Sequence, residues 1–156
     1  MKKKTFTFLF FLFLSSCGYE ATYSLKNRSI YAFSISEMVL TGDRQINLKI
    51  KQLLNPYNNP KIKEEKDFGL KISSSSEKII TTKDASGDAT KFKNKIIVKV
   101  QVFLNGKNAS NLVVIEDFIY NNNSNTFELK TYEKQIKNNL AEAAVNKILF
   151  KLVNNL

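Results

Sequence analysis

Residues 92–106 read FKNKIIVKVQVFLNG, and this stretch decides how the rest of the chain folds. Apolar side chains recur at every second position from Ile96 to Leu104, which is the period of a strand with one buried face. Asn105-Gly106 follows at once, and Asn-Gly is a strong hairpin signal because both residues tolerate positive φ. The stretch therefore predicts a long β-strand that turns directly into an antiparallel neighbour.

The segment after this turn predicts the neighbouring strand and then a long helix. Neither alternating face of residues 112–120 is cleanly polar, so we expect that strand to be partly covered on both sides. The asparagine-rich run 121–125 predicts a turn that can also supply a helix cap. A helix is expected over 126–156, with Glu133 and Lys137 as an i,i+4 pair on its outer side. Its apolar residues keep a 3.6-residue rhythm: Leu129, Tyr132, Ile136, Leu140, Ala143, Ala144, Ile148 and Leu152.

The segments before the quoted stretch begin with a strand and a helix. Residues 30–36 are β-branched and aromatic, which is typical of a strand. Asp43 is placed to cap a helix over 44–55, and Pro56 ends that helix because proline lacks an N–H. The apolar stripe of this helix consists of Ile46, Ile50, Leu53 and Leu54.

A further strand is predicted between this helix and the quoted stretch. Residues 68–72 alternate apolar and polar side chains, and 73–80 extend the strand through a bulge. The element order is therefore β-α-β-β-β-α. The economical arrangement is an α+β two-layer sandwich, in which a four-stranded, largely antiparallel meander carries two helices on one face. We expect one domain over residues 29–156.

The N-terminus has the layout of a secretory signal. Three lysines at 2–4 precede an apolar run at 6–14. The run is shorter than the roughly 20 residues that a membrane-spanning helix needs, so a permanent span is not expected. We interpret 1–16 as a signal peptide and 17–28 as a tether.

Leu14-Ser15-Ser16-Cys17 resembles the bacterial lipobox, in which the chain is cut before the cysteine. The resemblance implies covalent diacylglycerol on the Cys17 thiol and an N-acyl chain on its amine, and we expect no other cofactor. Such anchoring is stable, since it uses more than one chain. Gly18 follows the cysteine. By resemblance to the enterobacterial sorting rule, it implies delivery of the lipoprotein to the outer membrane, where it would face the periplasm. The alternative is an ordinary signal peptide with a chance cysteine.

The chain is strongly basic, with 24 Lys and Arg against 14 Asp and Glu. Removal of residues 1–16, which carry three lysines, lowers the formal net charge from +10 to +7. Such a balance favours anionic partners such as lipid headgroups or phosphorylated glycolipid, while export makes nucleic acid a poor candidate. Alternatively, the positive charge reflects codon bias rather than a ligand-binding surface, because an AT-rich genome imposes abundant Asn, Ile and Lys.

The side chains of the commonest catalytic centres are absent. The sequence has no histidine and no available thiol, which removes Ser–His and Cys–His nucleophiles and any N/S metal site. Glu64-Glu65 lies among lysines and is interpreted as a solvated loop rather than an acid–base pair. We therefore expect a protein that is not an enzyme, with no catalytic residue and no metal site.

Three segments together carry a family resemblance. Cys17-Gly18-Tyr19 is a lipidated cysteine followed by glycine and an aromatic residue, and Asp88-Ala89-Thr90-Lys91 opens the long strand. Phe118-Ile119-Tyr120-Asn121, then Phe127 and Tyr132-Glu133, lead into an alanine-bearing helix. In these features the chain resembles the lipopolysaccharide-assembly lipoprotein family LptE, with lysine where the family's Ala-Thr-Arg stretch has arginine. The tether lacks the proline-bearing segment of alphaproteobacterial members, which weakens the subfamily assignment.

This resemblance implies a plug inside an LptD-like outer-membrane β-barrel, which helps the barrel assemble and contacts lipopolysaccharide on its way to the outer leaflet. A barrel lumen is polar, and lipid A phosphates attract basic side chains. The candidate contacts are Lys83, Lys91, Lys93 and Lys95, which flank the turn at 84–90; the alternative is a solvated strand end. The rival function is a generic periplasm-facing lipoprotein that binds another envelope component such as peptidoglycan.

Overall fold

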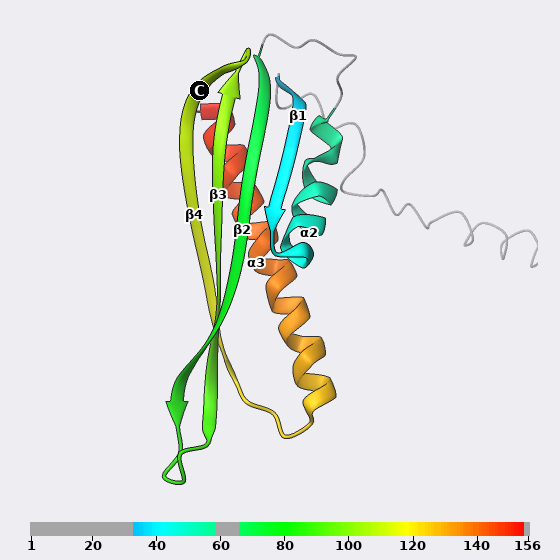
Figure 1. Cartoon of the computed structure of the whole chain (residues 1–156). Helices are drawn as coiled ribbons and strands as arrows, with labels where there is room; N and C mark the ends of the chain where they lie inside the picture. Colours follow the sequence, from blue (N-terminus) through cyan, green and yellow to red (C-terminus); the bar gives the residue numbers. More distant parts are fainter. Residues whose placement is uncertain (1–32, 59–65, 155–156) are drawn as a thin grey trace, which may run out of the picture. The chain divides into compact units, whose positions relative to one another are not determined.

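The computed structural model describes residues 33–58 and 66–154, all of which belong to one unit, Tyr31–Leu156. The predicted signal peptide, Cys17 and the tether therefore lie outside the described residues. The elements, in chain order, are β1 (Phe33–Gly42), α2 (Arg44–Leu54), the 3-10 helix η3 (Asn55–Tyr57), β2 (Lys66–Lys83), β3 (Ala89–Leu104), β4 (Lys107–Asn121) and α3 (Thr126–Asn154) (Figure 1).

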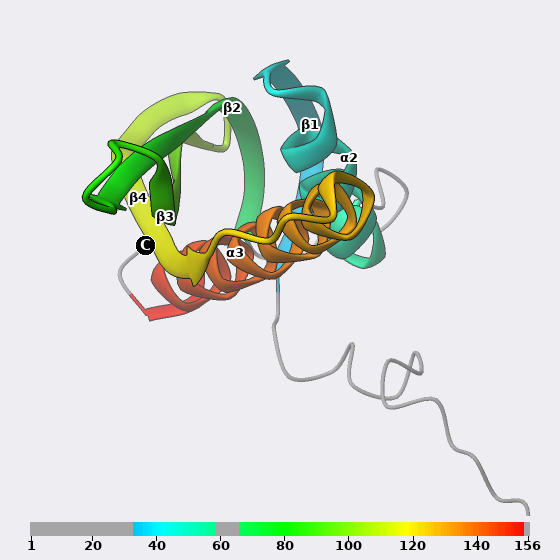
Figure 2. The ribbon, with the colours of Figure 1, turned by 90° about the horizontal axis from the view of Figure 1, so that it is seen from below.

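The strands form one sheet of four in the order β1-β2-β3-β4, and α2 and α3 cover the same face (Figures 1 and 2). β2, β3 and β4 make the predicted antiparallel meander, whereas β1 pairs parallel to β2. The predicted fold class, with a largely antiparallel sheet, is confirmed, and β1 is the strand that departs from the antiparallel meander. The reason is α2, which carries the chain back along the sheet so that β2 runs in the same direction as β1.

β1 spans Phe33–Gly42 and therefore continues beyond the end of the strand predicted at 30–36. Its register against β2 shifts between Ile35 and Glu37, so the next residue to pack on the core is Met38. This is a β-bulge, which inserts one residue and reverses the faces that follow it. A simple period of two therefore ends at the bulge, and the sequence pattern underestimated the strand.

The hairpin between β3 and β4 is the one predicted from the sequence. Asn105 and Gly106 have φ of 49° and 80°, and Leu104 pairs with Lys107 directly across the turn. Alternate residues of β3 are buried as expected. Two positive φ values in succession are the requirement of the tight turn that matches the twist of the strands.

Both helices begin at a side-chain cap. Oδ1 of Asp43 accepts hydrogen bonds from Gln45 N at 2.9 Å and Ile46 N at 3.1 Å, as predicted. Oδ1 of Asn125 accepts from the first backbone N–H groups of α3 at 3.1 and 3.3 Å. Each cap satisfies donors that have no partner within the helix.

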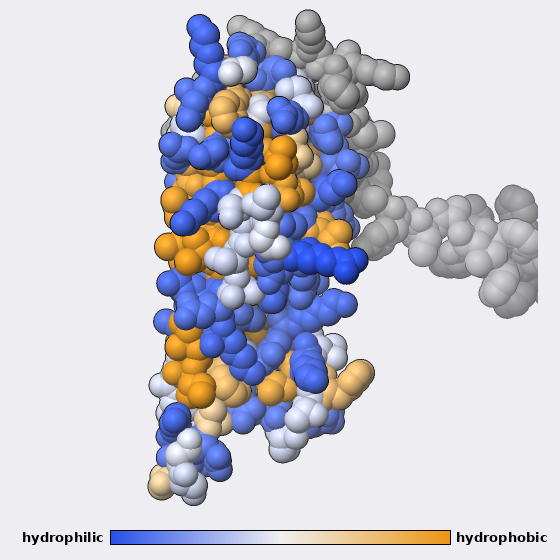
Figure 3. Space-filling view, viewed as in Figure 1, coloured by the Kyte–Doolittle hydropathy of each residue, from blue (hydrophilic) through white to orange (hydrophobic). Residues whose placement is uncertain are grey.

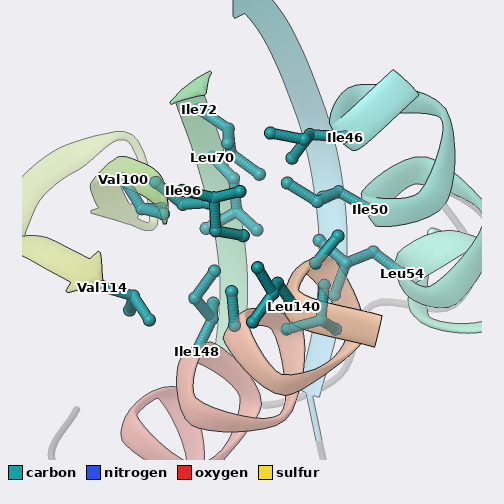
Figure 4. Close-up of a cluster of buried hydrophobic side chains, with 14 of the residues drawn as sticks. Ile46, Ile50, Leu54, Leu70, Ile72, Ile96, Val100, Val114, Leu140 and Ile148 are labelled. Atoms are coloured by element: carbon teal, nitrogen blue, oxygen red, sulfur yellow. The ribbon is translucent and has the colours of Figure 1, made fainter. Parts of the chain in front are cut away.

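The core lies between the helices and the inner face of the sheet, where side chains from α2, α3 and the strands point toward one another (Figure 4). The stripe predicted for α2 is confirmed at its three buried residues, Ile46, Ile50 and Leu54. The stripe of α3 is confirmed at Ile136, Leu140, Ala144, Ile148 and Leu152. Tyr132 is exposed and Ala143 only half-buried, whereas Ala141 and Val145, which were not predicted, are buried. Neither helix is long and apolar enough to cross a bilayer within the part of the chain that is described.

A polar junction fixes the helices to the sheet where β1 ends. Gly42 has φ of 96°, and Asp43 N donates to Ser74 O at 3.0 Å. Oδ2 of Asp43 accepts from Ser76 Oγ at 2.7 Å and lies 3.1 Å from Lys137 Nζ. Burial raises the pKa of Asp43, but hydrogen bonds from Ser76, Ile46 and Lys137 outweigh it, so the pKa lies below its ordinary value. One carboxylate thus joins β2, α2 and α3.

The outer face of the sheet has no covering layer among the described residues. Val113, Ile115 and Ile119 of β4 are 54%, 50% and 52% exposed. In Figure 3, apolar and hydrophilic residues are interleaved on the side of the molecule where Figure 1 places β4. β4 is expected from the sequence to be partly covered on both sides; no element among the described residues covers its outer face, where these side chains are about half exposed, because both helices lie on the inner face.

Candidate functional site

Three of the four predicted lysines lie together. Lys91, Lys93 and Lys95 share the outer face of β3, spaced about 6.6 Å apart as alternate residues of one strand. Lys83 is the last residue of β2 and pairs with Ala89, two residues before Lys91. All four lysines therefore belong to the β2–β3 hairpin, with Lys83 next to its turn and the other three along β3. Cys17, the predicted lipidation site, lies outside the described residues.

The surroundings of these lysines differ in charge. Lys95 has Glu77 of β2 and Asp117 of β4 as cross-strand neighbours, so carboxylates balance it locally. Lys93 has an isoleucine on each side, and Lys91 has a threonine and an asparagine. None of the ion pairs formed among the described residues involves the four lysines. Lys91 and Lys93 are therefore best placed for an added anion.

The hairpin turn itself is acidic and ordered by hydrogen bonds. Oδ1 of Asp84 accepts from Ser86 N and Asp88 N, both at 2.9 Å. Asp84 N also donates to Asp88 O at 2.9 Å, which closes the turn. Lys83 adjoins Asp84 in sequence and pairs with Ala89, the residue after Asp88, so its charge is partly balanced. The basic surface thus lies along β3 rather than at the turn.

A second cluster joins the hairpin to α3 on the inner face. Glu133 Oε1 accepts hydrogen bonds from Lys78 Nζ at 2.6 Å and Tyr120 Oη at 2.8 Å. Lys78 Nζ also lies 3.8 Å from the centre of the Phe92 ring. Burial, followed by the hydrogen bond and charge of Glu133, raises the pKa of Tyr120 above its usual value. The predicted Glu133–Lys137 pair is wrong, because Glu133 bonds to β2 and β4 and Lys137 bonds to Asp43, the cap of α2.

An open groove runs between the end of β4 and the first turns of α3. Its larger part has a volume of about 800 Å³ and is lined by the loop after β4, by Lys91 and by the beginning of α3. A smaller adjoining pocket of about 150 Å³ lies between β4 and α3. Phe118 and Tyr132, 46% and 45% exposed, line both parts. The smaller pocket is otherwise lined by Gln135, Ile136, Asn139 and Leu140.

Sequence reasoning missed this groove. The sequence pattern predicts Phe118 on a strand face and Tyr132 in the apolar stripe of the last helix, and both belong to the segment that carries the family resemblance. The signal that could have indicated a groove is the change in composition along α3, whose first turns are mostly polar around isolated aromatic residues. Such residues at the start of an otherwise packed helix indicate a surface that the domain does not cover by itself.

Comparisons with known proteins give a result at the level of structure only. No protein-family model matches the sequence, and no curated protein matches it. Rare lipoprotein B from Shewanella oneidensis is similar in structure, with a TM-score of 0.55 and 16% sequence identity; the match covers 76% of this chain and 98% of that protein. A minor lipoprotein from Acinetobacter baumannii has a TM-score of 0.57 at 10% identity and covers 80% and 92%.

Lipoprotein B from Nitrosomonas europaea gives a similar result, with a TM-score of 0.51 at 13% identity and coverage of 79% of this chain and 86% of that one. At these identities a likeness shows the fold and not the activity. The match spans most of each neighbour and most of the chain, so it concerns the whole domain rather than one motif. The chain therefore has the fold of bacterial lipoproteins of the rare lipoprotein B type.

Proposed function

We propose that this chain is an outer-membrane lipoprotein that plugs an LptD-like β-barrel, helps it assemble and assists lipopolysaccharide insertion into the outer leaflet. The observation that carries the proposal is the fold shared with lipoproteins of the rare lipoprotein B type, over 76% of this chain and 98% of the Shewanella oneidensis protein. The lipobox-like Cys17 motif supports the same assignment independently, because it is read from the sequence of a segment outside the described residues.

The surface of the domain suits such a role. The sheet presents a face with lysines, serines and partly exposed aliphatic residues, and no helix among the described residues covers it. The lumen of an outer-membrane barrel is polar, so a plug needs a polar exterior over a rigid core. Both features are present in the unit Tyr31–Leu156.

Co-purification tests the proposal directly. A tagged chain, extracted from membranes in mild detergent, should bring down a large outer-membrane β-barrel in near-stoichiometric amount. The Cys17→Ala variant should leave the membrane fraction while its domain still folds. Recovery of the tagged chain without any barrel would reject the plug assignment, and a Cys17→Ala variant that stays tightly anchored would reject the lipid anchor.

The lysine contact with lipopolysaccharide has a separate test. Lys91→Glu combined with Lys93→Glu should weaken binding of purified lipopolysaccharide at low salt by about tenfold or more, since charge-assisted contacts to phosphate are lost. Lys107→Glu is the control, because Lys107 is exposed at the opposite end of the sheet. If the double variant binds lipopolysaccharide as well as the wild type does, these lysines are solvated surface residues with no role in binding.

A further inference from the structure

β4 is an edge strand with little of the usual protection of an edge. It borders β3 on one side, and no strand of the described residues pairs with its other side. Across residues 108–121 the strand contains neither lysine nor proline, two residues that natural edges use to prevent pairing with another chain. Its charged residues there are Glu116, which forms an ion pair with Lys147 of α3, and Asp117, which neighbours Lys95 of β3. A row of backbone N–H and C=O groups is therefore available over the length of β4.

The groove between β4 and α3 opens at this same edge. β1 and β2 contribute nothing to its lining, and β3 contributes only Lys91, so both pockets lie at the β4 border of the sheet, between β4 and α3. The smaller pocket, between Phe118 and Ile136, is about 150 Å³. An apolar cavity of about that size holds a benzene ring, so one large apolar side chain fits.

On the outer face of the sheet, β4 carries apolar side chains beside this edge, and the neighbouring strand β3 carries basic ones. Val113 and Ile119 are the cross-strand neighbours of Lys99 and Lys93. A strand added beyond β4 would lie about 10 Å from β3, a gap that lysine and glutamate side chains span together. A second copy of the chain would bring little negative charge there, because the only carboxylate on that face of its β4 is Asp117, which already neighbours its own Lys95.

We infer that the free edge of β4 and the β4–α3 groove bind an extended segment of a partner polypeptide. The segment adds to the sheet as a further strand, puts an apolar side chain into the pocket beside Phe118, and turns acidic side chains toward Lys93 and Lys99. Backbone pairing along β4 distinguishes such a strand from an acyl chain, which has no groups to satisfy it. The inference rests on the proposed function, in which the barrel protein supplies the strand.

Site-specific photo-cross-linking in cells tests this inference. A photoreactive amino acid at Ile115 or Val113, on the β4 edge, should give an adduct with the same barrel that co-purifies with the chain. Leu48 on α2 and Val39 on β1 are the matched controls, because they are also exposed aliphatic residues, at 58% and 41%. They should give at least tenfold less of that adduct.

The outcomes separate the inference from the proposed function. If the barrel co-purifies but cross-links only from Leu48 or Val39, the edge assignment is overturned and the proposed function stands. An adduct from Ile115 to a second copy of the chain, or to lipid alone, also overturns it. If no barrel co-purifies, the proposed function fails, and the assignment of the strand to that barrel fails with it.

Two substitutions test the mechanism of docking. Ile115→Lys places a protecting charge on the edge and should reduce the recovered complex about tenfold, whereas Leu48→Lys should leave it unchanged. Lys99→Glu should reduce recovery severalfold if the docked strand is acidic, and recovery equal to the wild type overturns that part of the inference. Circular dichroism of each purified variant should match the wild type, since all three side chains are largely exposed.

Discussion

The two ends of the sheet are held to α3 by different kinds of contact. Near α2, aliphatic side chains from every strand and both helices pack together with almost no exposure. Beyond Ser74 in β2 and before Asn94 in β3, no side chain of the hairpin is fully buried. There the contact with α3 is made by Lys78, Tyr120 and Glu133, which bond through one carboxylate oxygen.

This difference separates stability from binding within one domain. Burial of apolar surface is the main stabilising contribution, and it is concentrated at the α2 end. The hairpin end has polar and aromatic contacts, and it also has the lysine row and the groove. Regions with few buried apolar contacts open at low cost in free energy, and binding surfaces are drawn from such regions.

Gly42→Ala should have the largest effect on stability, because it would disrupt the junction between β1, β2 and α2. A Cβ at this position would lie 1.9 Å from Ser74 O, and the backbone has φ of 96°. We expect a loss of about 4 kcal/mol or more in the free energy of unfolding, measured by urea denaturation. Gly87→Ala is the control, because its φ is 91° but nothing lies within 4 Å of the added Cβ. Equal losses at both glycines would show that φ alone sets the cost.

Ile50→Ala tests the packed core next. The side chain is completely buried between α2 and the sheet, so its truncation should lower the free energy of unfolding by about 3 kcal/mol. Phe118→Ala, in the groove, should cost less than about 1.5 kcal/mol despite removing a larger side chain, because half of that ring is already in water. Urea denaturation of both variants measures the contrast, and a reversed order would contradict the division of the molecule into two ends.

Tyr120→Phe tests the polar contact at the hairpin end. It removes the hydrogen bond from Tyr120 Oη to Glu133 and should cost about 2 kcal/mol, since the acceptor is charged. Hydrogen exchange should accelerate in the β2–β3 hairpin more than in α2. Tyr132→Phe is the control and should change stability by less than about 0.5 kcal/mol, because its side chain lies at the surface and is 45% exposed. Uniform exchange across the domain would argue against a separately opening hairpin.

Asp43→Asn should have the smallest effect at neutral pH, about 1 kcal/mol, because Asn still caps α2 but loses its charge opposite Lys137. The folded-state pKa of Asp43 is below the unfolded value near 3.8, so its contribution is complete above that pH and is lost as the pH falls through the folded pKa. The difference between variant and wild type should therefore shrink on acidification below about pH 4. Unfolding curves at several pH values measure it, and a constant difference would reject the ionic contribution.

Elements whose signals are local could be predicted from the sequence. Asn105-Gly106 specifies a tight turn, Asp43 specifies a helix start, and the spacing of Ile46, Ile50 and Leu54 specifies a buried face; all three predictions agree with the structure. Each of these predictions depends only on residues that are close to one another in the sequence. The position of Lys91 and Lys93 on one face of a strand follows from the same local rule.

Features that depend on distant residues could not be predicted in this way. Alternation shows that β1 has a buried face but not in which direction its neighbour runs, so the parallel pairing was missed. The bulge after Ile35 interrupts the pattern without any glycine or proline to indicate it. The groove needs Phe118 and Tyr132 side by side, although a turn and a helix start separate them in sequence. The function of Cys17 remains a prediction from its local motif.

The parallel pairing of β1 with β2 has a consequence for the order of folding. β2, β3 and β4 are joined by short turns, so their contacts close small loops and can form early. β1 is synthesised first, but its partner strand exists only after α2 and the following loop have been made. Until then Phe33 and Ile35 have nowhere to be buried, and a newly made chain exposes them to solvent. Among the described strands, β1 thus waits longest for its partner strand, and it is the segment for which a chaperone has the most time to compete.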